Sequence, residues 1–464
     1  MSAEVNETEP GSDSGGSAAA EEQPDWKSMR GVIGVQIQNT LNDKITQFML
    51  IGLGGAIAGR MPLSERDTWA FKLLDDYDLF VSLLISIPFV VFGPIAGWFS
   101  DHCSKKTVLR TALIIQSFVL AWIATGLILQ MVVWTTFGFF LLAIQSAMLG
   151  PARVGICKDL VGSKKLAAVT GITQMVSIVG MITGTVIGGR AFSYLSRVLR
   201  EETGASAQSM EPSWNAAAII IGILFVLSVI PFLVLMIVKK TPAHPEVKFH
   251  RSLWWIHFHH MSDLFRERRM GLAAGTVTFF WFTAGVMALV IIQAGKEVFP
   301  AGNERAIEAS SYINGVLGVG VAAGSIFMTQ LCRECNRVGL SPIGAGGIGL
   351  SLAVLSTLAT NSVPYYIGVF SMGFFGGIFL VPLSTLVQDL AAEERRGRVI
   401  SAMSLLSALA LLGSVGFAKL LRQFGFGSHS QYLILGILAI LAVIPTLILT
   451  KQHSRVQRID PANA

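Results

Sequence analysis

Twelve long apolar stretches constrain the fold of this chain more than any other feature of its sequence. A helix needs about 20 residues to cross the hydrocarbon core of a bilayer, and each stretch is long enough. Only 14% of the residues are charged, whereas roughly a quarter are charged in a soluble domain. A soluble multidomain enzyme is therefore excluded. The predicted spans cover residues 31–59, 79–100, 107–129, 131–152, 166–189, 215–238, 271–294, 310–331, 340–360, 363–388, 398–420 and 431–450.

The distribution of Lys and Arg predicts the orientation of these spans. If both termini are cytoplasmic, 24 of the 35 Lys and Arg residues fall on the cytoplasmic side, 10 fall on the opposite side, and Lys44 lies within the first span. Cytoplasmic loops of membrane proteins carry such an excess of positive charge. We therefore expect a multi-pass protein of the plasma (inner) membrane. The net charge of +6 is explained in this way, and no nucleic-acid partner is expected.

The chain divides into two halves of six spans each. A long basic loop separates the halves, and its apolar and histidine residues alternate as in an amphipathic helix at a membrane surface. The predicted division is a disordered cytoplasmic tail at 1–26, an N-terminal six-helix bundle at 27–238, a cytoplasmic linker with an amphipathic helix at 239–270, a C-terminal six-helix bundle at 271–450, and a cytoplasmic tail at 451–464.

A faint internal repeat relates the two halves. Asp159 follows Gly150-Pro151 by eight residues and precedes a basic turn, and Asp389 follows Pro382 by seven residues and also precedes a basic turn. Duplicated six-helix bundles can tilt about a central site and open it to each side in turn. The fold class predicted is therefore an all-α membrane protein with twelve helices in two pseudo-symmetric bundles. A helical membrane protein without transport function is the alternative.

Neither the cysteines nor the histidines predict a metal site. Cys332-x-x-Cys335 lacks a second pair of ligands at a suitable spacing, and a helix end explains it better. His257, His259 and His260 alternate with apolar residues in the central loop. We expect no metal and no cofactor.

The first span carries the charged residues that matter most. A charged side chain inside a bilayer costs about 2.5 kcal/mol or more unless it is paired or faces a cavity, and Asp43 and Lys44 lie within span 31–59. Helical spacing places several polar residues on the face of Asp43. We predict that this stripe lines a substrate cavity; a helix packed by buried amide networks is the alternative. The candidate substrate-binding residues are Gln36, Asn39, Asn42, Asp43, Lys44 and Gln47.

Glycines at four-residue spacing predict close helix contacts in two further spans. Such small-residue faces let helix backbones approach each other. The faces consist of Gly180, Gly184 and Gly188 in span 166–189, and Gly320 and Gly324 in span 310–331. We interpret both as sliding seams between the halves, with ordinary tight packing as the alternative.

A segment between the second and third spans resembles a known signature. The run from Gly97 through Asp101 to Lys105 and Lys106 is similar to the motif of the major facilitator superfamily, with Ser104 in place of the usual second glycine. The resemblance implies the predicted two-bundle fold and a role in gating. We extend that role to basic and acidic residues near the same side. The candidate gating residues are Gly97, Asp101, Lys105, Lys106, Arg153, Asp159 and Asp389.

Three other segments resemble the lysophospholipid transporter branch of that superfamily: residues 41–44, 150–156 and 376–383. That branch usually has Asn at the position of Lys44, and some relatives have a basic residue in the seventh span, where this chain has none. Lys44 is therefore the candidate to supply that charge. Residues 180–189 also resemble the signature of drug/proton antiporters, although Thr185 stands where that signature has Pro.

The resemblance implies a secondary transporter that moves lysophospholipids from the outer to the inner leaflet by alternating access. A proton-coupled transporter of another small amphiphile, with Asp43 as the protonated site, is the alternative, and a membrane scaffold is a third. We expect no enzymatic activity, since the chain has neither a phosphate-binding loop for ATP nor the His-x-x-x-x-Asp pair of acyltransferases. The expected partners are the lipid or amphiphilic substrate, membrane lipids and an acyltransferase acting downstream.

Overall fold

The structure is a computed structural model of the whole chain. It describes residues 25–65, 68–239, 241, 253–299, 302–332, 337–360, 362–391 and 396–459. Most of the tail predicted at 1–26 lies outside these residues, as do parts of the linker predicted at 239–270.

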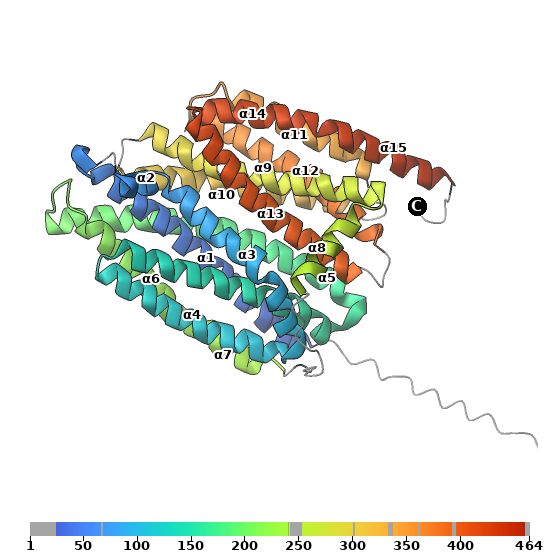
Figure 1. Cartoon of the computed structure of the whole chain (residues 1–464), viewed down its shortest axis with the longest axis horizontal. Helices are drawn as coiled ribbons and strands as arrows, with labels where there is room; N and C mark the ends of the chain where they lie inside the picture. The colour runs from blue at the N-terminus through green and yellow to red at the C-terminus, as the bar shows by residue number, and fades with distance from the viewer. Residues whose placement is uncertain are drawn as a thin grey trace, which may run out of the picture.

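The described residues form α-helices joined by short turns, which confirms the predicted fold class (Figure 1). The helices of the first half are α1 (Trp26–Arg60), α2 (Trp69–Asp75), α3 (Tyr77–His102), α4 (Lys105–Ile128), α5 (Val132–Thr203), α6 (Glu211–Leu227) and α7 (Val229–Ile237). Helix α8 (Leu253–Leu264) follows in the linker. The second half contains α9 (Arg268–Val298), α10 (Arg305–Leu331), α11 (Ser341–Leu355), α12 (Val363–Asp389), α13 (Arg396–Gln423), α14 (Ser428–Leu441) and α15 (Val443–Ile459).

Helix α5 is two spans joined at a glycine. A straight helix of 72 residues would be about 108 Å long, far more than a bilayer requires. The chain breaks the helix at Gly162, whose φ of 72° and ψ of 172° are non-helical, and glycine adopts this positive φ without a steric penalty. The first arm of α5 is residues 132–162 and the second arm is residues 163–203. These arms correspond to the two spans predicted at 131–152 and 166–189.

Eleven stretches of described helix are long and apolar enough to cross a membrane, one fewer than predicted. Helix α1 is absent from that set although it has 35 residues and is about 50 Å long. The polar residues from Gln36 to Gln47 reduce its mean hydropathy. Because α1 runs beside α3 and α5, its place within the bundle comes from packing rather than from apolar composition.

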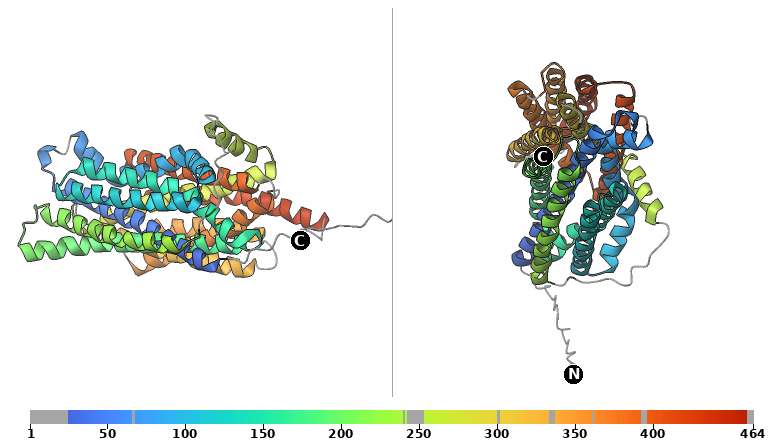
Figure 2. Two further views of the ribbon diagram at one scale, coloured as in Figure 1. Left: turned by 90° about the horizontal axis from the view of Figure 1, so that it is seen from below. Right: turned by 90° about the vertical axis from the view of Figure 1, so that its left-hand side faces the viewer.

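The helices pack as two bundles. Helix α1 packs mainly on α5, while α4 packs on α5 and α6, and we call α1 and α3–α7 the N-bundle. Helices α9–α15 pack on one another in the same way and form the C-bundle. Viewed along the helices, the second half of the chain lies beside the first (Figure 2). The bundles meet where α3 contacts α13 and where α5 contacts α10.

The two ends of this assembly differ. Helix α1 begins and α15 ends at one end, which we call the terminal end (Figure 1). The opposite end, where α1 stops at Arg60 and α10 starts at Arg305, is the distal end. The predicted tail 451–464 is helical through Ile459 as part of α15.

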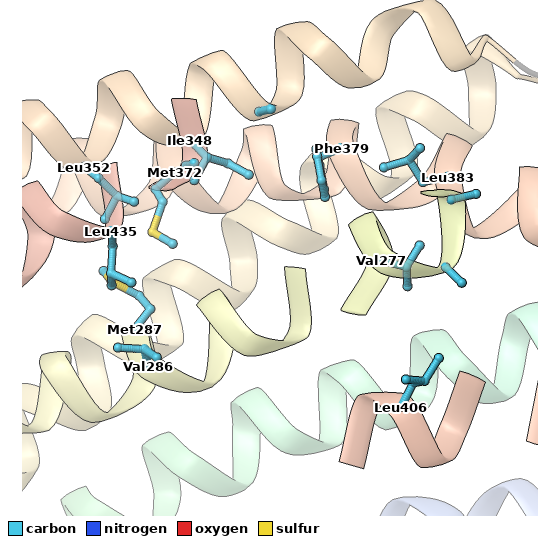
Figure 3. Packing of buried hydrophobic residues seen from close by; sticks show 14 of the residues in the cluster. Val277, Val286, Met287, Ile348, Leu352, Met372, Phe379, Leu383, Leu406 and Leu435 are labelled. Atoms are coloured by element: carbon cyan, nitrogen blue, oxygen red, sulfur yellow. The ribbon is translucent and has the colours of Figure 1, made fainter. Parts of the chain in front are cut away.

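Apolar side chains fill the interior of each bundle. Figure 3 shows part of the C-bundle core, in which Met287 of α9 and Leu435 of α14 pack near Leu352 of α11 and Met372 of α12. Ile292 and Ile307 of the C-bundle belong to an apolar cluster of the N-bundle. Since both residues lie toward the distal end, the two cores touch there.

Helix α8 is the helix predicted in the linker. It contacts α13, α9 and α3, and therefore touches both bundles. Leu264 is buried in the C-bundle core, with Met261 packed against it. The side chains of His257 and His260 lie outside the described residues, and a membrane-surface location for α8 stays a prediction.

Candidate functional site

Asp43 lies at the centre of a polar site in the N-bundle. The Ser146 hydroxyl, on the first arm of α5, donates to the two carboxylate oxygens at 2.9 and 2.7 Å. The amide nitrogen of Asn39 lies 3.3 Å from Asp43 Oδ2 and from Ser146 Oγ. Helix α1 therefore holds its carboxylate against α5 by hydrogen bonds.

Lys44 turns away from Asp43. Its ammonium group donates to Gln47 Oε1 at 2.9 Å, and its stem lies over Gly184 on the second arm of α5. Adjacent helical residues point about 100° apart, which accounts for the separate partners. Both Asp43 and Lys44 keep partial exposure.

A second cation belongs to the site. Arg153, on the first arm of α5, is near enough to Asp43 to interact with it electrostatically, and it is partly exposed. Arg153 follows Ser146 by seven residues on the same arm of α5, and its role in a cytoplasmic gate stays a prediction. The site thus combines one carboxylate with the cations Lys44 and Arg153.

The other polar residues of the predicted stripe are not open to a cavity. Gln36, Asn39, Asn42 and Gln47 are each at most 6% exposed. Gln36 bonds Ser177 on the second arm of α5. These four residues therefore face protein in this state, whereas Asp43 and Lys44 are partly exposed. A role of the four in substrate binding stays a prediction.

Sequence reasoning missed polar residues on α4 and α5. Gln116 and Gln145 are buried, and atoms of both side chain amides have no hydrogen-bond partner among the described residues, as is also true of Asn42 Nδ2. An unpaired buried polar group is costly. The available signal was a Gln-Ser pair within an apolar run, found at 116–117 and again at 145–146.

The predicted gate residues lie within the N-bundle, except Asp389. Lys105 of α4 pairs with Asp159 of α5 at 2.8 Å, and Lys106 donates to the carbonyls of Met236 and Val238 at the end of α7. These contacts join neighbouring helices of one bundle, so they are not bonds between bundles. Asp389 is exposed at the end of α12.

The glycine of the recognised motif makes no close helix contact in this state. A Cβ on Gly97 would meet no atom of the described residues within 4 Å. The side chain of Asp101 lies outside the described residues, as does Cys335.

Carboxylates at the distal end connect the two bundles instead. Asp78 of α3 is fully buried and pairs with Arg422 of α13 at 2.6 Å and with Lys296 of α9 at 2.7 Å. Among the residues that the structure describes, every ion pair between the two bundles lies at this end. Removal of one partner from a buried ion pair destabilises the structure that contains it by about 3–5 kcal/mol. This contact therefore stabilises the closed arrangement of the distal end.

Glu304 forms the second of these bridges. It lies just before α10 and pairs with Arg60 of α1 at 2.6 Å and with Arg200 of α5 at 3.0 Å. Burial alone would raise the pKa of Glu304, but Arg60 and Arg200 outweigh it and hold the pKa below its ordinary value. Glu304 is therefore an ionised link to the N-bundle.

Glu308 forms the third bridge, one turn further along α10. Arg190 and Arg197 of α5 lie 3.2 and 3.3 Å from its two carboxylate oxygens. The hydroxyl of Ser193 donates to it at 2.8 Å. This bridge is more exposed than the other two, since the Arg190 side chain is 56% exposed.

A cavity adjoins the first two bridges. Its volume is about 220 Å³, and its lining includes Gly55, Lys296, Glu304 and Ser310. Because residues of α1, α9 and α10 line it, the cavity lies between the bundles at the distal end.

The predicted sliding glycines pack inside their own bundles. Gly180, Gly184 and Gly188 face Thr40, Lys44 and Ile45 of α1. Gly320 and Gly324 face the backbone of α12 at Phe370 and Phe374. The assignment of both faces to the seam between bundles is therefore wrong, and ordinary tight packing describes them.

Different residues form the seam between α5 and α10. Gly189 faces Ser311, Gly315 faces Val186, and Gly318 faces Ile182. On α5, Ile182 and Val186 lie two positions from glycines that face α1, and residues two positions apart lie about 200° apart around a helix. The second arm of α5 thus contacts α1 with one face and α10 with the other.

The sequence model of the Major Facilitator Superfamily matches residues 74–416, which cover most of both bundles. The chain belongs to the Major Facilitator Superfamily. The superfamily assignment and the eleven apolar spans together make the chain an integral, multi-pass membrane protein and a transporter rather than an enzyme.

Curated relatives within this superfamily are lysophospholipid transporters. The chain is 22% identical to the lysophospholipid transporter LplT of Serratia proteamaculans over 72% of this chain and 76% of the relative. It is 23% identical to the protein of the same name from Citrobacter koseri over 85% of this chain and 88% of the relative. The predicted resemblance to this branch is confirmed at this level of identity.

Solved structures of other transporters share the fold. A POT family transporter matches with a TM-score of 0.59 and 14% identity, over 90% of this chain and 96% of that one. The fucose:proton symporter of E. coli matches with a TM-score of 0.56 and 12% identity, over 88% and 98%. These likenesses concern the fold.

Proposed function

We propose that this protein is a secondary transporter that moves lysophospholipids across the membrane by alternating access. The observation that carries the proposal is the site around Asp43, where a partly exposed carboxylate and the cations Lys44 and Arg153 occur on two neighbouring helices of the N-bundle. A phosphodiester needs cationic donors, which Lys44 and Arg153 provide. An amine or hydroxyl of the headgroup needs an acceptor, which Asp43 provides.

The distal bridges support alternating access. Asp78, Glu304 and Glu308 connect the bundles at one end, and such contacts must break when the bundles tilt to open that end. With both termini in the cytoplasm, as the positive charges predict, the distal end is the outer one. We propose that the described state is closed to the outside, and that transport runs from the outer to the inner leaflet.

The source of energy is a separate part of the proposal. Facilitated movement of the lipid needs no ion gradient, whereas a proton-coupled carrier would use Asp43 as its protonated group. Partial exposure of Asp43 is compatible with both. A separate acyltransferase would then act on the imported lipid, because a lysophospholipid has one acyl chain fewer than a bilayer lipid.

Uptake into proteoliposomes tests the function. Labelled lysophospholipids that differ in headgroup are added outside vesicles with and without the protein, and the label reaching the inner leaflet is measured over time. We expect protein-dependent uptake of at least one of them. If an uncoupler abolishes uptake, the proton-coupled alternative is correct; if the vesicles with protein match the empty ones for every lipid, lysophospholipid transport is rejected.

A further inference from the structure

The three bridges between the bundles are not equally tight. The shortest contacts of Asp78 and Glu304 are 2.6 Å each, and these carboxylates are 0% and 7% exposed. Both ion pairs of Glu308 are longer than 3 Å, and its partners Arg190 and Arg197 are 56% and 36% exposed. A ligand from solution or from the membrane can therefore compete most easily at Glu308.

Positive charge exceeds negative charge at this side of the seam. Glu304 and Glu308 face four guanidinium groups, from Arg60, Arg190, Arg197 and Arg200. Arginine N–H groups bind phosphate through paired hydrogen bonds. Arg190 and Arg197 each contact Glu308 through one nitrogen, so both keep further donors for an anion.

Neighbouring groups favour a phosphate carried on an amphiphile. The Tyr312 hydroxyl bonds Arg190, and the Arg190 guanidinium also lies 5.7 Å from the centre of the Tyr312 ring. Ile187 and Tyr194, on the same arm of α5, are 45% and 55% exposed. A charged headgroup at Arg190 would thus have apolar and aromatic side chains beside it for its chain.

We propose that Arg190 and Arg197 form a phosphate-binding site at the distal seam between α5 and α10, which Glu308 occupies in the closed state. The assignment of a lipid as its ligand rests on the proposed function. The site is separate from the site of Asp43. A phosphate that replaces the Glu308 carboxylate removes one bridge between the bundles, so ligand binding and opening of the distal end are coupled.

Two variants of the full-length protein distinguish phosphate binding by these arginines from an ion pair that only holds the bundles together. Glu308→Gln leaves both arginines free for phosphate, whereas Arg190→Ala/Arg197→Ala removes the site, yet both variants break the same bridge. Binding of lysophosphatidylglycerol, which has a phosphodiester and no amine, is measured on purified protein. The uncharged monoacylglycerol of the same chain length serves as a second probe, and Arg305→Ala, at an exposed arginine of α10, is the matched control.

Opposite responses are expected. Glu308→Gln should tighten binding of lysophosphatidylglycerol and the double variant should weaken it, each by about tenfold, as expected for gain or loss of charged hydrogen bonds. The control and the monoacylglycerol should show no change. If both variants shift the affinity for lysophosphatidylglycerol in the same direction, the cluster only holds the bundles together and the proposal is overturned. An equal shift in the affinity for monoacylglycerol also overturns it.

Binding of inorganic phosphate shows whether the ligand is a lipid headgroup or free phosphate. It also tests the phosphate site independently of the proposed function. Weak binding of free phosphate with tight binding of the lipid supports a lipid headgroup. If the unmodified protein binds no lysophospholipid while free phosphate still responds in opposite directions to the two variants, the phosphate site stands and the proposed function fails. Where the double variant is unstable, Arg190→Ala alone gives the same comparison.

Discussion

Asp78 of α3 and Arg422 of α13 form an ion pair of 2.6 Å although 344 positions separate them in the chain. This contact joins the second span of one bundle to the penultimate span of the other. It places the connection between the bundles at the end remote from the chain termini, where no candidate gate residue was predicted.

Loss of this pair should open the distal end. In Asp78→Asn the charges of Arg422 and Lys296 lose their buried partner, which destabilises the closed state by about 3–5 kcal/mol. Labelling of a cysteine at Ser310, which lines the distal cavity, should become faster by at least about tenfold. The native cysteines are replaced by serine in both proteins, and an unchanged labelling rate would show that Asp78 does not hold the bundles together.

Acid should weaken the contact of Glu304. Its pKa is lowered, so its contribution is complete above the ordinary value of 4.5 and is lost as pH falls through the lower value in the folded protein. Spin labels at Glu201 and Arg305, exposed residues of α5 and α10, should move apart below pH 4.5. In Glu304→Gln the pH-dependent step should be absent, and a step of equal size in that variant would show that Glu304 is not its source.

Asp43 should be needed for transport but not for folding. Asp43→Ala removes the acceptor proposed for the amine or hydroxyl of the headgroup, and charged hydrogen bonds of this kind contribute about 1.5–3 kcal/mol, so transport should fall by at least about tenfold. Expression should stay near normal. Asp159→Ala, which removes a pair with Lys105 inside the N-bundle, is the control, and uptake by Asp43→Ala equal to that of the control would exclude Asp43 from the site.

Two glycine-to-alanine variants compare a glycine in the contact between α5 and α10, Gly189, with the glycine of the superfamily motif, Gly97. A Cβ at Gly189 would overlap Ser311 of α10, whereas a Cβ at Gly97 would meet no atom within 4 Å. Overpacking costs about 1–3 kcal/mol, so Gly189→Ala should open the seam and increase labelling at Ser310→Cys. Gly97→Ala should behave as the unmodified protein, and the reverse order of effects would contradict the seam described here.

Much of the architecture could be predicted from the sequence, because a bilayer requires long apolar helices and that requirement is local. The apolar runs follow from residue type alone and gave eleven of the twelve expected spans. The break of α5 at Gly162 was found only in the structure. Helix α1 could not be confirmed as a span by composition, since its polar stripe is stabilised by packing on α5.

The site was only partly predictable. The sequence itself determined that Asp43 and Lys44 are charges within a span, which is costly without a partner. Only the tertiary structure decided those partners: Ser146 lies 103 positions away from Asp43, and the distal carboxylates lie still further from the bases that bind them. Helical spacing tells which residues share a face, but not which helix that face meets. Folding brings distant segments together, and so it assigned Gly184 to α1, Arg153 to Asp43 and the contacts between bundles to the distal end.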